Sequence, residues 1–156
     1  MKIIVDMMGG DNAPLEIVKG ALQAQKRFGV DIVFTGDEAA IRDALAQCGV
    51  NELPQGMDIV PTTEEVTMED DPATVFRRKK DTSMGVGLTL LKNGGGDAMV
   101  SAGSTGALLT GATLITKRIH GIRRAAMAPV IPTTTGSAVL IDCAVNLVLA
   151  SMLITI

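Results

Sequence analysis

The chain has 156 residues, which suits one domain or most of one, and its formal net charge is −3 at pH 7. This mild charge gives no reason to expect a nucleic-acid partner, and the chain lacks the Trp and Tyr platforms on which single-stranded nucleic acids stack. Hydrophobic residues make up 47% of the chain and aromatic residues only 2%, so we expect an aliphatic, Met-rich core. The two cysteines form no CxxC pair, which fits a reducing, cytoplasmic setting.

The N-terminal segment has the pattern of a strand, a glycine turn and a helix. The apolar run over 2–6, bounded by Lys and Asp, predicts a short buried strand. Gly9 and Gly10 predict a tight turn, Asn12 a helix N-cap, and the periodicity a helix over 14–28.

Two acidic side chains flank this turn, and two interpretations stay open for them. Asp6 and Asp11 suit hydrogen bonds to a ligand hydroxyl, or to Lys or Arg elsewhere in the fold. They are equally well explained as a strand-end residue and a helix cap.

The strand–helix pattern repeats along the next part of the chain. Strands are expected over 31–35 and 57–60, with a helix between them that ends near Gln47. Repeats of this kind predict an α/β fold, in which a parallel sheet with right-handed crossovers carries helices on both faces.

Residues 62–83 depart from this pattern, because an acidic stretch precedes four consecutive cations, Arg77 to Lys80. A short helix that starts at Pro72 would explain the charges through its dipole. The cations also precede a second helix, capped by Thr82 or Ser83, whose N-terminus would suit an anion. Both interpretations stay open.

A strand over 98–100 ends in a turn of small residues, Ser101 to Gly106, and a helix of about 105–119 follows. Backbone N–H groups at such a turn suit a phosphate, although an ordinary strand–helix turn with a Ser or Thr cap has the same pattern.

The remaining features predict structure rather than chemistry. The glycine loop over 94–96 precedes a strand, so it is interpreted as a connector, and His120 as a partner of a helix dipole. No metal-ligand spacing is present. Strands are expected over 127–132 and 137–141, and the apolar run over 138–156 favours a buried strand and helix over a membrane span.

Four segments, taken in order, resemble the signatures of the PlsX family of bacterial phosphate acyltransferases, which act in phospholipid synthesis. They are VDMMGGDNAP over 5–14, RKKDTSM over 78–84, SAGSTGA over 101–107 and GIRR over 121–124. The resemblance covers residues 1–142, which we expect to be the N-terminal part of a phosphate acyltransferase domain.

The resemblance implies transfer of a fatty acyl group from acyl carrier protein, or from coenzyme A, to inorganic phosphate, which gives an acyl phosphate. It implies a three-layer α/β/α sandwich with a mostly parallel sheet, similar to phosphotransacetylases and isocitrate/isopropylmalate dehydrogenases. Members of the family are cytoplasmic homodimers, and they often associate peripherally with the membrane.

Phosphate is partly dianionic near neutral pH and needs no strong base to attack a thioester, so the protein has to position it and to stabilise the oxyanion. Helix N-termini with nearby cations do both, so no metal or cofactor is expected. The candidate catalytic residues are Lys80, Ser83 and Arg124. The candidate phosphate- and substrate-binding residues are Asp6, Gly9, Gly10, Asp11, Ser101, Gly103, Ser104, Thr105 and Gly106.

The chain departs from the family pattern at Ala125, where the family usually has Pro, and again after Asp142. Residues 143–156 are expected to be a divergent apolar tail, so the fold would be incomplete at its C-terminal end, and both an active acyltransferase and one inactivated by truncation stay open. The alternative is a non-catalytic phosphate-binding α/β domain. An NAD-dependent dehydrogenase of the related fold is disfavoured, because no GxGxxG follows the first strand.

Overall fold

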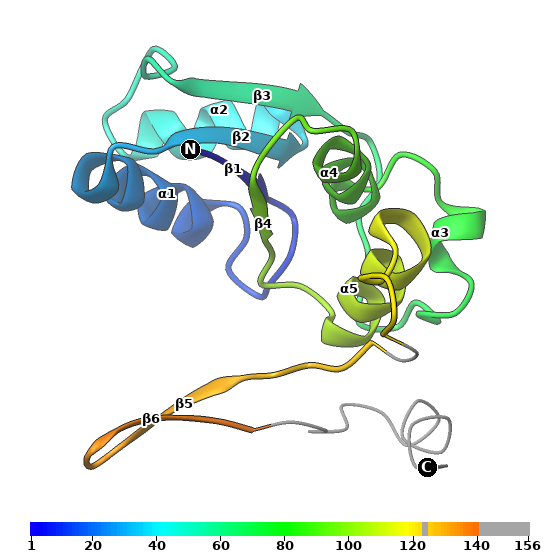
Figure 1. The fold of residues 1–156 in the computed structure, drawn as a ribbon. Coiled ribbons are helices and arrows are strands. Elements are labelled where there is room, and N and C mark those ends of the chain that lie inside the picture. Colours follow the sequence, from blue (N-terminus) through cyan, green and yellow to red (C-terminus); the bar gives the residue numbers. More distant parts are fainter. Residues whose placement is uncertain (123–124, 141–156) are drawn as a thin grey trace. The chain divides into compact units, whose positions relative to one another are not determined.

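The computed structural model describes residues 1–122 and 125–140, which belong to two compact units that divide after Thr116. The first unit contains a parallel sheet of four strands in the order β3-β2-β1-β4 (Figure 1). The strands are β1 (Lys2–Asp6), β2 (Asp31–Gly36), β3 (Met57–Pro61) and β4 (Ala98–Val100). The predicted α/β class with a mostly parallel sheet is therefore confirmed.

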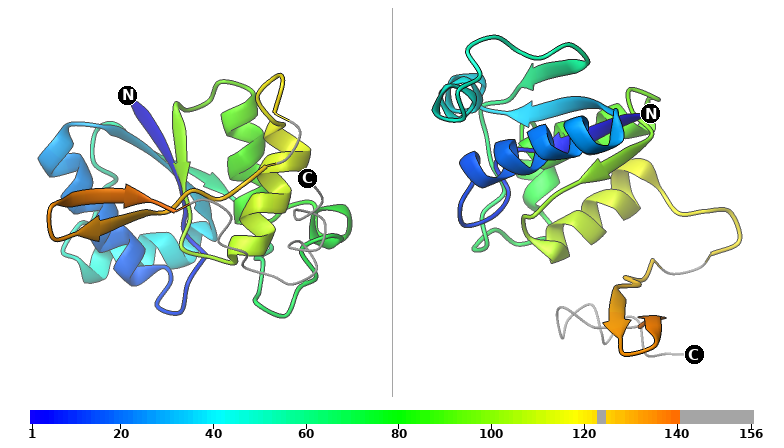
Figure 2. Two further views of the ribbon diagram at one scale, coloured as in Figure 1. Left: turned by 60° about the horizontal axis from the view of Figure 1, so that its bottom comes forward. Right: turned by 90° about the vertical axis from the view of Figure 1, so that its left-hand side faces the viewer.

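Helices cover both faces of this sheet (Figures 1 and 2). On one face lie α1 (Leu15–Phe28) and α2 (Glu38–Gln47). On the other face α4 (Ser83–Lys92) contacts β1, β2 and β4, and it packs against α5 (Thr105–Gly111) and the π-helical turn η1 (Ala112–Thr116). The short α3 (Val75–Arg78) precedes α4.

The core of the unit is aliphatic and rich in Met, as the composition predicts. Beneath α1 and α2, Phe34 and Met7 are fully buried beside Met57. On the opposite face Met84 and Leu88 of α4 are buried against the partly buried Met99. Because β2 is covered on both faces, its residues are buried continuously rather than alternately.

Most helix boundaries agree with the sequence prediction, and three differ, one of which is the start of α3 at Val75 rather than at Pro72. The N-cap of α1 is Pro14, which makes no side-chain capping bond, so the prediction of an Asn12 cap is wrong. The helix expected over 105–119 is α-helical only as far as Gly111 and π-helical to Thr116, and Lys117 then adopts a φ of 74°. This left-handed conformation cannot continue a helix, so the helical segment ends before His120.

The described part of the second unit contains an antiparallel hairpin of β5 (Val130–Thr133) and β6 (Gly136–Val139). The two strands predicted here are therefore confirmed, with β5 beginning three residues later than expected. Arg124 and the predicted apolar tail over 143–156 lie outside the described residues. Within the ranges that the structure describes, no helix has both the length and the apolar character needed to cross a bilayer.

Candidate functional site

The candidate site lies where β1 and β4 end at the carboxyl edge of the sheet. From β1 the chain passes through α1 to β2, its neighbour on one side, whereas β4 pairs with the other side of β1. The strand order therefore reverses between β1 and β4. In open α/β sheets, ligands bind in the crevice outside the carboxyl ends of the strands at such a reversal.

A chain of hydrogen bonds joins the two strand ends. The hydroxyl of Ser101 donates to Oδ2 of Asp6 at 2.7 Å, and the Gly103 N–H donates to Oγ of Ser101 at 3.1 Å. The Met8 N–H donates to the other carboxylate oxygen of Asp6 at 3.2 Å. Asp6 is 1% exposed, so these bonds replace the hydrogen bonds that water would make to its carboxyl group.

The backbones of the two loops also approach each other closely. A Cβ added to Gly9 would lie 2.7 Å from the Gly103 nitrogen and 2.9 Å from Oδ2 of Asp6, so only glycine fits. Gly10 has a φ of 108° and faces Ala102. The glycine pair therefore lets the loop after β1 lie directly against the loop after β4.

These loops form one side of a cavity of about 420 Å³. The residues that line it are Met8, Gly10, Asp11, Glu65, Val66, Thr67, Met68, Ala102, Gly103 and Ser104. Backbone and small polar groups of Gly103 and Ser104 line the cavity together with residues 65–68, which are called the wall. The cavity therefore has a side suited to an anion and a side that carries apolar groups.

A second cavity of about 320 Å³ shares Met8 and Glu65 with the first and lies over the ends of β2 and β3. Thr62 lines it and is 5% exposed. Its Oγ1 has no hydrogen-bond partner in the part of the chain that the structure describes.

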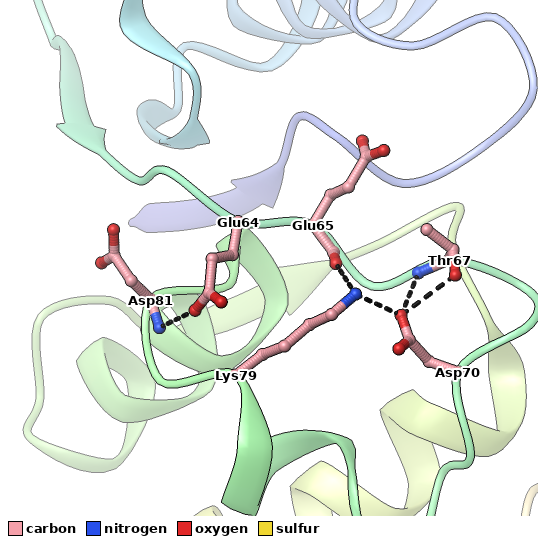
Figure 3. A network of polar contacts seen from close by, with 6 residues as sticks. All are labelled: Glu64, Glu65, Thr67, Asp70, Lys79 and Asp81. Atoms are coloured by element: carbon pink, nitrogen blue, oxygen red, sulfur yellow. Dashed lines mark hydrogen bonds and ion pairs between the residues drawn. The ribbon is translucent and has the colours of Figure 1, made fainter.

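Lys79 holds the wall over 65–68 in place (Figure 3). Its ammonium lies between the backbone oxygen of Glu65, at 3.0 Å, and Oδ2 of Asp70, at 2.6 Å. The same carboxylate oxygen accepts from the backbone N–H and the hydroxyl of Thr67 at 2.9 and 3.0 Å. The Lys79 hydrogen bond is the main cause that lowers the pKa of Asp70 to about 2.

Backbone pairing holds the beginning of the same segment. Glu64 and Thr82 form a parallel bridge, and the Ser83 N–H donates to the Glu64 oxygen at 3.2 Å. Oγ1 of Thr82 accepts from the Gly85 N–H at 3.1 Å, so Thr82 is the N-cap of α4. The backbone N–H groups of Ser83 and Gly85, in the first turn of α4, therefore have partners within the protein, which leaves fewer N–H groups there to bind an anion.

The structure brings most of the predicted binding residues together. Gly10, Asp11, Gly103 and Ser104 line the larger cavity, and Asp6, Gly9 and Ser101 form the junction beneath it. Ser104 is the N-cap of α5, with Oγ accepting from the Ala107 N–H at 3.4 Å, so Thr105 and Gly106 form the first turn of that helix.

The predicted catalytic residues lie differently. Lys80 is exposed and its ammonium donates to the Phe76 carbonyl at 3.2 Å, whereas Ser83 is buried in the first turn of α4. Neither lines the larger cavity, and Arg124 lies outside the described residues. Their catalytic roles stay predictions.

Sequence reasoning missed the contribution of Lys79, Asp70 and the wall over 65–68. The motif over 78–84 contains Lys79, but nothing in the linear pattern distinguishes it from Lys80. Among the described residues no cluster of three or more His, Cys, Asp or Glu side chains could hold a metal ion.

A sequence model of the family described as fatty acid synthesis protein matches residues 1–154. Proteins named phosphate acyltransferase are similar over 94% of the chain. They include those of Alkaliphilus oremlandii at 44% identity, Thermoanaerobacterium thermosaccharolyticum at 45% and Thermotoga neapolitana at 47%. The chain covers 43%, 42% and 41% of these relatives, respectively, and so spans less than half of their length.

The crystal structure of a phosphotransacetylase from Streptococcus pyogenes has a similar fold. It superimposes with a TM-score of 0.65 at 20% identity, over 94% of this chain and 47% of that one. The fold agrees with the α/β sandwich that the motifs imply. With the family match over nearly its whole length, the chain belongs to the fatty acid synthesis protein family, whose relatives here are phosphate acyltransferases.

Proposed function

We propose that the chain forms the phosphate-binding part of a site that transfers a fatty acyl group from acyl carrier protein to inorganic phosphate. The acyl phosphate product would serve phospholipid synthesis. The names of the relatives and the four PlsX-like motifs support this proposal.

One observation supports it most directly, which is the junction between the ends of β1 and β4. The Asp6–Ser101–Gly103 hydrogen bonds fix the turn that starts α5 at the edge of a cavity. The first N–H groups of a helix have no partner within the helix, so this turn offers donors to an anion.

In the proposed reaction a phosphate oxygen attacks the carbonyl carbon of the thioester. A C–O bond to phosphate forms, the C–S bond breaks, and the carrier leaves as a thiolate that then takes up a proton. Backbone N–H groups of Ser104, Thr105 and Gly106 would hold the phosphate, and preorganised donors of this kind would also stabilise the oxyanion of the tetrahedral intermediate.

The other predicted residues have assigned roles within this proposal. Lys80 and Arg124 would supply positive charge to the phosphate, and Ser83 a hydroxyl donor. Lys80 has a long, exposed side chain, and among the described contacts its ammonium is bonded only to the carbonyl of Phe76 in α3. It is therefore available to turn towards a ligand.

The experiment is a transfer assay on the purified chain with palmitoyl-acyl carrier protein and inorganic phosphate. Acyl phosphate is trapped with hydroxylamine and identified by mass spectrometry. We expect phosphate-dependent product with the wild type, and a loss of about 10²-fold or more in Ser104→Gly, because that change removes an N-cap and a donor beside the phosphate. Ser137→Gly, in the exposed strand β6, is the matched control and keeps wild-type turnover.

Phosphate-dependent thermal stabilisation without any product would instead support the non-catalytic phosphate-binding domain. Neither product nor stabilisation by phosphate would contradict both functions.

A further inference from the structure

We propose that Lys79 is a positioning residue that sets the wall over residues 65–68, and that this wall receives the acyl-thioester part of the donor. The inference rests on the proposed function. It adds Lys79 as a positioning residue and assigns the acyl-thioester part of the donor to one side of the cavity.

The wall depends on long-range contacts for its position. Residues 65–67 have no regular secondary structure, and a turn follows at Met68. The two bonds from Lys79, to the Glu65 carbonyl and to Asp70, span this segment from one end to the other. Asp70 then holds Thr67 through two further bonds. One ammonium group therefore fixes both ends of the stretch that lines the cavity.

The Lys79–Asp70 ion pair is partly buried, so it can hold the wall in a fixed position. The side chains of Lys79 and Asp70 are 31% and 19% exposed, whereas both side chains are at least 43% exposed in the ion pairs Lys2–Asp58, Lys19–Glu16 and Arg42–Glu38. A partly buried pair with several hydrogen bonds keeps its geometry better than an exposed pair, which water and salt weaken.

The chemistry of the wall suits an uncharged ligand. Val66 and Met68 bring apolar side chains from the wall to the cavity, and Met side chains adapt to irregular apolar ligands. Glu65 of the wall also lines it, and Figure 3 shows the Glu65 carboxylate pointing away from the Lys79 ammonium. This carboxylate would repel a phosphate dianion on this side.

Phosphate is therefore expected on the side of Gly103 and Ser104, and the acyl thioester on the side of residues 65–68. A thioester with its acyl chain is shared by acyl carrier protein and coenzyme A, so either donor would use the same wall.

The test compares the wild type with Lys79→Met, Lys79→Arg and the control Arg77→Met, which removes an exposed cation from α3. Hydrogen exchange measures how firmly residues 65–70 are held. Calorimetry measures the Kd of inorganic phosphate and of thioether analogues of palmitoyl-coenzyme A and palmitoyl-acyl carrier protein.

For Lys79→Met we expect amide exchange over 65–70 to be about tenfold faster, because the local opening free energy falls. The Kd of the thioethers should rise about tenfold and that of phosphate change less than about twofold. Lys79→Arg should recover most of the thioether affinity, and Arg77→Met should match the wild type. If the Kd of only one of the two thioethers rises in Lys79→Met, the wall is assigned to that donor.

Unchanged exchange in Lys79→Met, or equal weakening of phosphate and thioether, overturns the inference. A wild type that binds phosphate but no thioether also overturns it. A wild type that binds no phosphate contradicts the proposed function instead, and the exchange data still decide whether Lys79 holds the wall.

Discussion

The hydroxyl of Ser101 donates a hydrogen bond of 2.7 Å to the carboxylate of Asp6, which lies 95 positions earlier in the chain. This bond joins the ends of β1 and β4 and supports the turn proposed to bind phosphate. Asp6 is buried, so each of its few partners matters to the free energy of unfolding.

Ser101→Ala removes one of these partners and leaves a buried carboxylate oxygen without it. We expect the free energy of unfolding, measured by urea denaturation, to fall by about 1–3 kcal/mol. Ser137→Ala, an exposed position in β6, should change it by less than about 0.5 kcal/mol. Equal effects of the two substitutions would show that the Asp6–Ser101 bond does not stabilise the fold.

Gly9→Ala tests the close approach of the two loops. Its Cβ would lie 2.7 and 2.8 Å from backbone atoms of Gly103, so the loops have to separate. We expect a loss of about 1–3 kcal/mol in urea denaturation and the loss of stabilisation by phosphate.

Gly20→Ala is the matched control, because a Cβ there meets open space on the exposed side of α1. Ala is favoured over Gly in a helix interior by about 1 kcal/mol, so this variant should be slightly more stable than the wild type. A Gly9→Ala protein as stable as Gly20→Ala contradicts the described geometry.

The Lys79–Asp70 pair predicts a dependence of stability on pH. The pKa of Asp70 is lowered from 3.8 to about 2, so the folded state favours the ionised form. The pair therefore stabilises the protein above the ordinary pKa, and this contribution is lost as the pH falls through about 4 towards 2. Because the pair is partly exposed, it contributes no more than about 1 kcal/mol.

Urea denaturation of the wild type and of Asp70→Asn at several pH values measures this contribution. The difference in unfolding free energy should be constant near neutral pH and shrink as the solution is acidified below the ordinary Asp pKa. A difference that persists unchanged in strong acid would show that the ion pair is not its source.

Two phenylalanines provide a matched test of the core. Phe34 in β2 is 0% exposed, whereas Phe28 at the end of α1 is 66% exposed. Phe34→Ala should lower the free energy of unfolding by about 3–5 kcal/mol, because it opens a cavity under α1 and α2. Phe28→Ala should cost less than about 1 kcal/mol, since it removes mainly a contact with Arg27. Similar losses would contradict the assignment of the core.

The sequence pattern predicts the elements of the first unit well where local signals agree. Residues 2–6 form the expected strand, and Gly29, with a φ of 62°, ends α1 as a helix C-cap. Strong apolar periodicity and glycine stops are local properties, so they are readable from neighbouring residues.

The parts that escaped prediction depend on distant residues. The Ser101–Asp6 bond requires β4 to lie beside β1, and Lys79 differs from Lys80 only through the position of Glu65 and Asp70. Gly111 stands where the α-helical part of this segment ends, but no glycine or proline stands at Lys117 to indicate the end of the helical segment. The turn over 101–106 was recognisable from its residues, but its place at the strand-order reversal follows only from the topology.

The most direct test of the account is an NMR titration of the isotopically labelled chain with inorganic phosphate. The account predicts that the amide resonances of Gly103 to Gly106 shift with increasing phosphate, with those of Gly9 and Gly10 following them. The resonances of the β5–β6 hairpin should stay in place. Shifts that gather elsewhere in the chain, or none at millimolar phosphate, would contradict a phosphate site at the junction of β1 and β4.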